Sequence, residues 1–143
     1  MKGEYCKYYP EFESKAEEKG NLILRSSKDM RVSNAYNINI ARGNIINTDY
    51  RLLELAPSKE LFNWYINLKN TNNLYEGWFE DYRKVYLNQL KNNKKALNQL
   101  KHIKDKLDNG INVAIYCFCK DVNKCHRNII GNLFEKKGYK VFR

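Results

Sequence analysis

The chain has 143 residues, of which 43% are apolar and 29% are charged, and these proportions suit a single soluble domain with one core. The longest apolar run, at residues 113–118, is far shorter than the roughly 20 residues that a membrane-spanning helix needs. The first residues show no apolar signal core, which argues against secretion. We therefore expect a cytoplasmic protein without a membrane partner, formed by one domain over residues 1–143, in which residues 1–20 are a candidate N-terminal extension.

The first half of the chain predicts two strands and a helix. Residues 11–20 are charged and compatible with a helix. The apolar run at 21–26 predicts a buried strand, and the alternation of Ile with Asn at 37–41 predicts a second, short strand. Ser58, which follows Pro57, predicts the N-cap of a helix.

Two amphipathic helices are predicted next. Aromatic residues recur at helical spacing over 75–90, and an apolar stripe with lysines on the opposite face covers 97–107. Asn92-Asn93 predicts a break between these helices, and Asn109-Gly110 predicts the end of the second. We assign the aromatic side chains Trp64, Trp78, Tyr82 and Tyr86 to the core rather than to stacking on nucleic-acid bases.

The net charge of +10 favours partners that carry phosphates. Much of it comes from the second amphipathic helix and its surroundings, where a single acid, Asp105, stands among Arg83, Lys84, Lys91, Lys94, Lys95, Lys101, Lys104 and Lys106. One interpretation is a non-catalytic module that binds nucleic acid or a nucleotide through this lysine-rich helix. A solvated helix face explains the same charges equally well.

The last third of the chain determines the predicted fold class. Residues 111–118 form the clearest strand, and they are apolar on both faces, as expected when helices cover both sides of a sheet. A loop at 119–124, a helix at 125–137 and a strand at 139–142 complete a βαβ unit. We therefore predict an α/β fold, specifically a small three-layer Rossmann-like domain with a mostly parallel sheet.

The loop between this strand and helix is the predicted functional site. Ligands of α/β sheets bind beyond the carboxyl ends of the strands, and the start of a helix favours anions. We expect a phosphate-bearing small molecule or nucleic acid to be bound here, and the residues predicted to hold it are Arg127, Lys120 and Asn128, with Ser26 and Arg42 at the ends of neighbouring strands.

Thiol chemistry is one interpretation of this loop. Cys117 or Cys125 would be the nucleophile and His126 the acid or base, and the protein would process the ligand that it binds. The spacing does not fit a Cys-x5-Arg phosphatase loop, because Asn123 and Cys125 occupy the positions where Arg would be needed.

Metal binding is the alternative interpretation. Cys117, Cys119, Cys125 and His126 supply the donor set of a tetrahedral zinc site, and iron is a second candidate ion. Adjacent residues of a helix diverge by about 100°. Cys125 and His126 can therefore bind one ion together only if the helix starts later than Cys125. A third interpretation is that Cys117 and Cys119 are small core residues at a strand end, with His126 and Arg127 capping loops or pairing with acids.

The loop and its flanks also resemble a known family. The strand Val113–Cys119, followed by Cys125-His126-Arg127 and a helix, resembles the C-terminal signature of the domain of unknown function 488 family. Leu55-Ala56-Pro57-Ser58-Lys59 and the following aromatic helix are similar to a second conserved piece of that family. The resemblance implies a compact α/β domain with a pocket around Cys117, Cys125, His126 and Arg127. The family commonly has an acid where this chain has Cys119, which favours a thiol-rich or metal-binding role.

Overall fold

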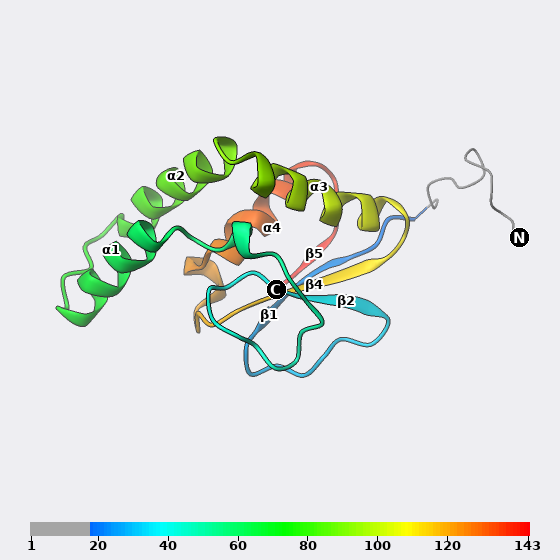
Figure 1. Cartoon of the computed structure of the whole chain (residues 1–143), viewed down its shortest axis with the longest axis horizontal. Coiled ribbons are helices and arrows are strands. Elements are labelled where there is room, and N and C mark those ends of the chain that lie inside the picture. Colours follow the sequence, from blue (N-terminus) through cyan, green and yellow to red (C-terminus); the bar gives the residue numbers. More distant parts are fainter. Residues whose placement is uncertain (1–17) are drawn as a thin grey trace, which may run out of the picture.

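The computed structural model describes residues 18–143, so most of the helix-compatible segment predicted at 11–20 lies outside the described residues. Within this range, three strands are followed by three helices and then by a strand, a helix and a strand, and apart from the third strand this is the order that the sequence predicts (Figure 1). The elements are β1 (Leu22–Ser26), β2 (Ala35–Asn39), β3 (Tyr50–Arg51), α1 (Lys59–Asn70), α2 (Trp78–Lys91), α3 (Lys94–Asp108), β4 (Asn112–Cys117), α4 (His126–Lys136) and β5 (Val141–Phe142), with short 3₁₀ turns at Leu53–Leu55 and Val122–Lys124.

The described strands form one five-stranded sheet in the order β3-β2-β4-β1-β5, and every pairing in it is parallel. β4 lies at the centre between β1 and β2, which explains why its residues are buried on both faces. The predicted Rossmann-like α/β class is confirmed. β3 was not predicted from the sequence, because it consists of two exposed residues without an apolar pattern.

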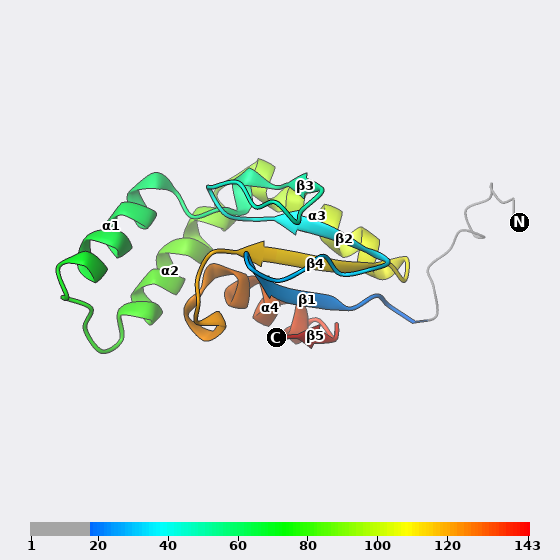
Figure 2. The ribbon, with the colours of Figure 1, turned by 90° about the horizontal axis from the view of Figure 1, so that it is seen from below.

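The expected third layer is built from loops rather than helices in residues 18–143. Figures 1 and 2 show α1 to α4 on one side of the sheet, where they share the main core with residues such as Leu22 and Ile115. Loop residues Val32 and Ile45 cover the opposite face. Right-handed crossovers place connections that run in opposite directions on opposite faces. The connections from β1 to β2 and from β2 to β3 run toward the β3 edge of the sheet, whereas the helical connections from β3 to β4 and from β4 to β5 run toward the β5 edge. The loops and the helices therefore lie on opposite faces.

The predicted helix boundaries follow from local capping. Ser58 caps α1, and its hydroxyl accepts a hydrogen bond from the Leu61 N–H at 3.1 Å. Asn93 separates α2 from α3, because its side chain accepts the N–H groups of Lys95 and Ala96. None of the helices in the described part of the chain has the length and hydropathy to cross a bilayer.

The hairpin of α1 and α2 extends past the sheet toward the side on which β2 and β4 end (Figure 2). Two side chains of α2 hold the segment that leads into α1. The Tyr86 hydroxyl donates to the Leu55 carbonyl at 2.6 Å, and the Gln89 amide donates to the Ala56 carbonyl at 2.9 Å and accepts from the Ser58 N–H at 2.8 Å. This anchoring fixes where α1 leaves the body of the domain.

We predict that Tyr86→Phe lowers the free energy of unfolding by about 1–3 kcal/mol, because it leaves the buried Leu55 carbonyl without this donor. Tyr50→Phe is the control, since Tyr50 is half exposed, and its effect should stay within about 0.5 kcal/mol. Urea denaturation measures both. Equal effects of the two variants would show that the Tyr86 hydroxyl does not stabilise this segment.

Candidate functional site

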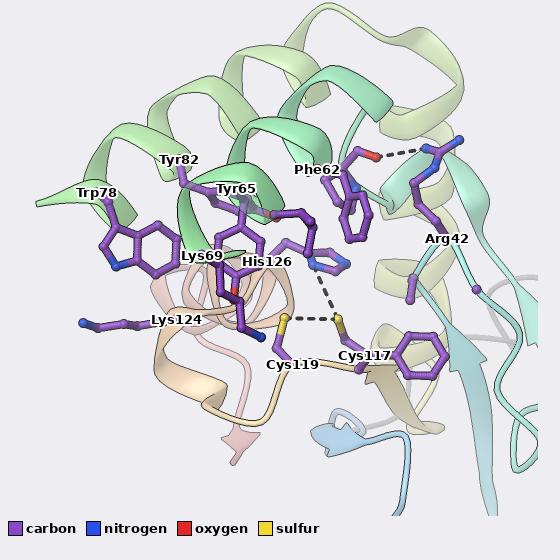
Figure 3. Close-up of a pocket in the computed structure, with 15 residues that line it drawn as sticks. Arg42, Phe62, Tyr65, Lys69, Trp78, Tyr82, Cys117, Cys119, Lys124 and His126 are labelled. Atoms are coloured by element: carbon purple, nitrogen blue, oxygen red, sulfur yellow. Dashed lines mark hydrogen bonds between the residues drawn. The ribbon is translucent and has the colours of Figure 1, made fainter. Parts of the chain in front are cut away.

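A pocket of about 370 Å³ opens at the carboxyl ends of β2 and β4, beneath the hairpin of α1 and α2 (Figure 3). Its floor comes from the ends of the strands and the β4–α4 loop, and its roof from the two helices and the segment that leads into α1. The floor residues are Ala41, Arg42, Gly43, Cys117, Phe118, Cys119, Lys124 and His126, and the roof residues are Pro57, Phe62, Tyr65, Ile66, Lys69, Trp78 and Tyr82.

Four side chains that the sequence predicts as site residues come together at this floor, and we call them the Cys–His cluster: Cys117, Cys119, Cys125 and His126. The Sγ atoms of Cys117 and Cys119 are 3.7 Å apart. The Nδ1 atom of His126 lies 3.6 Å from Cys117 Sγ and 3.8 Å from Cys125 Sγ. The three cysteines are free thiols, and Cys119 is the most exposed of them.

The imidazole of His126 is held in one tautomer. Its Nε2 atom lies 2.8 Å from the Ile40 carbonyl at the end of β2. A carbonyl oxygen can only accept, so Nε2 carries the proton and Nδ1 presents its lone pair to the thiols. Burial lowers the pKa of His126, which keeps the ring neutral.

The thiols of the Cys–His cluster differ in their electrostatic surroundings. The pKa of Cys117 is lowered well below its usual value by hydrogen bonds from the Cys119 and Cys125 thiols, with further help from the Cys119 N–H and the charge of Arg127. Burial raises the pKa of Cys125. The pKa of Cys119 is raised by its contact with Cys117. These surroundings favour the thiolate form at Cys117 over the other two thiols.

The backbone at Cys125 allows both Cys125 and His126 to contribute to the cluster. The helix predicted to start at Cys125 starts one residue later, at His126, and Cys125 is the extended N-cap residue with φ −140° and ψ 150°. The divergence expected of two adjacent helical residues therefore does not apply. Because the helix starts after Cys125, the side chains of Cys125 and His126 can bind one ion together.

Arg127, predicted to bind an anion, is buried, and its side chain is surrounded by backbone carbonyl groups. Its guanidinium donates to the carbonyls of Cys119 at 2.9 Å, Cys117 at 3.4 Å and Arg25. It therefore joins the end of β1 to the β4–α4 loop and holds the backbone that carries two of the thiols.

The other residues predicted to bind the ligand are dispersed. Arg42 lines the pocket, and its guanidinium also donates to the Pro57 carbonyl at 2.9 Å. In the part of the chain that the structure describes, Lys120, Asn128 and Ser26 do not line it. Lys120 is exposed, the Asn128 side chain accepts from Arg143 at 2.7 Å, and Ser26 lies at the end of β1.

The roof of the pocket was missed by the sequence analysis. Phe62, Tyr65 and Lys69 come from α1, whose amphipathic pattern shows no functional residue. Trp78 and Tyr82 were predicted as core residues, and both are buried, but each also forms part of the pocket wall. The resemblance of Leu55–Lys59 and the following aromatic helix to a family signature was the one sequence feature that pointed to a role for this region.

Comparison with known protein families supplies the decisive observation. Residues 12–138 match DUF488-N3a, described as the active DUF488-N3 subclade. The chain belongs to the DUF488 family. The resemblance predicted from the Cys-His-Arg and Leu-Ala-Pro-Ser segments is thus confirmed. Comparisons of this DUF488 protein with curated proteins and with solved structures gave no match.

We predict that Arg127→Lys lowers the free energy of unfolding by about 2–3 kcal/mol, because an ammonium group cannot reach the same carbonyls as the planar guanidinium. Arg83→Lys, at an exposed ion pair with Glu80, is the matched control and should cost about 0.5 kcal/mol or less. Urea denaturation distinguishes the two. A neutral effect of Arg127→Lys would contradict the structural role.

Proposed function

We propose that this DUF488 protein binds a phosphate-bearing ligand with a planar ring, such as a nucleotide, in the pocket above the Cys–His cluster. The observation that carries the proposal is the chemistry of the lining. Arg42, Lys69 and Lys124 supply positive charge, and no Asp or Glu of the described residues lines the pocket. A pocket with this charge balance selects for an anionic ligand.

The aromatic walls support a ligand with a ring. Phe62 and Phe118 line the pocket and are 40% and 50% exposed, and Tyr65 stacks on Trp78 with a centroid distance of 5.1 Å. Flat aromatic faces next to cations suit stacking of a base while its phosphate is held at the rim. The volume of about 370 Å³ is in the range of small-molecule sites.

The groups available to process a bound ligand are at the floor. Cys117, Cys119 and His126 line the pocket, whereas Cys125 stands behind them. A ligand whose ring lies under the roof would therefore meet sulfur and imidazole at its inner end. We also propose a cytoplasmic location, because neighbouring reduced thiols persist in a reducing compartment.

The lysine-rich helix α3 is the second candidate surface, for nucleic acid. Its lysines are mostly exposed, as predicted. Two of them are partly compensated, since Lys101 contacts Asp105 at 3.3 Å and Lys104 contacts Asp108 at 2.7 Å. This pairing weakens the case for α3 and favours the pocket.

We predict that nucleotides bind more tightly than the corresponding nucleosides, and that Lys69→Ala combined with Lys124→Ala weakens nucleotide binding about tenfold or more. Calorimetric titration of the common nucleosides and their 5′-phosphates measures this. In a Trp64→Phe background, fluorescence of the remaining tryptophan, Trp78, reports binding in the pocket.

The matched control removes the same charge from α3 through Lys95→Ala combined with Lys101→Ala. Nucleotide affinity should be unchanged in this double variant. A loss of affinity in the α3 variant with none in the pocket variant would place binding on the helix and contradict the proposal. Equal affinity for nucleosides and nucleotides would contradict the role of the phosphate.

A further inference from the structure

Three distances within the Cys–His cluster match the edges of a metal coordination tetrahedron. Bonds of about 2.3 Å from zinc to sulfur and about 2.0–2.1 Å to nitrogen imply S···S edges of about 3.8 Å and S···N edges of about 3.6 Å. The observed S···S distance is 3.7 Å, and the observed S···N distances are 3.6 and 3.8 Å. The donor atoms of Cys117, Cys125 and His126 all lie within 4.8 Å of one another. Cys119 is outside this group of three, and its Sγ lies 3.7 Å from that of Cys117.

The donors converge from separate parts of the backbone. Cys117 is the last residue of β4, Cys119 belongs to the following loop, and Cys125 and His126 stand at the start of α4. The extended conformation of Cys125 brings its sulfur toward the same centre as the imidazole of the next residue. A zinc site requires thiolate and imidazole groups to point at one centre, whereas apolar packing of the same side chains does not.

The surroundings of His126 provide an independent observation. The side chain is 2% exposed, and its Nδ1 lone pair faces thiols, which are weak hydrogen-bond donors. Its Nε2–H donates to the Ile40 carbonyl. Metal-ligating histidines characteristically donate their second ring N–H to a carbonyl or carboxylate, which fixes the tautomer. The ring is therefore already oriented for ligation through Nδ1.

We propose that this DUF488 protein binds one zinc ion through Cys117, Cys119, Cys125 and His126 Nδ1. The ion ties the end of β4 and the β4–α4 loop to the start of α4. Cys119 is the fourth ligand, since its Sγ already contacts that of Cys117 from the loop that follows β4. The site stands at the pocket floor, yet the proposal does not depend on the identity of the pocket ligand.

Elemental analysis of the purified full chain tests the proposal without any substitution. We expect about one equivalent of zinc, because a structural site at its usual affinity stays filled through purification. Cobalt(II) bound in place of zinc should show the intense visible bands of a tetrahedral thiolate complex. Less than about a tenth of an equivalent of zinc, both as purified and after reconstitution under reducing conditions, would overturn the proposal. One equivalent of iron instead of zinc would overturn the choice of ion.

Single cysteine variants test the ligand set. Cys125→Ser should lose the ion, and Cys119→Ser should bind zinc about tenfold or more weakly in competition with a chromophoric chelator. Cys6→Ser removes one thiol outside the proposed set and should retain the full equivalent of zinc. Loss of zinc in Cys6→Ser, or full retention in both other variants, would contradict the assignment. The zinc content is measured without nucleotide, so failure here leaves the nucleotide test unaffected.

Discussion

The hydrogen bond from His126 Nε2 to the Ile40 carbonyl determines much of the site. It connects the first residue of α4 to the chain just after β2, across the end of β4. It also fixes which nitrogen of the buried ring is free to face sulfur. A parallel sheet makes this contact available, because the strands end on the same side and leave backbone carbonyls next to the following helices. The guanidinium of Arg127, one residue further along α4, secures the same loop from the other side through the carbonyls of Cys117 and Cys119.

Several parts of the fold could be predicted because their signals are local. The N-cap at Ser58, the break at Asn93 and the strand before Cys117 depend on residues adjacent in sequence, and the structure contains all three. The proximity of the site cysteines could also be anticipated from their short separation. The start of α4 was predicted one residue early, and this small difference decides whether Cys125 and His126 face one centre.

The features that escaped prediction depend on contacts between distant segments. The hydrogen-bond acceptor for His126 is the backbone carbonyl of Ile40. Every residue type has this carbonyl, so the amino-acid sequence does not reveal the contact. Arg127 looks like an anion ligand in sequence, yet burial directs its charge to carbonyl groups. Lys69 became part of the pocket only because α1 folds back over the strand ends. The loop layer on the second face follows from strand order, which apolar patterning does not encode.

The roof of the pocket and the donor groups at its floor are separate along the chain. The roof belongs to residues 57–82, whereas the sulfur and imidazole groups belong to residues 117–126. Phe62 and Ile66 contact the pocket from α1, which carries a single buried residue, Leu61. Redesign of these two side chains can therefore change the shape of the pocket while the donor groups beneath keep their geometry. The shape of the pocket and the geometry of the sulfur and imidazole groups are therefore set by separate segments of the chain.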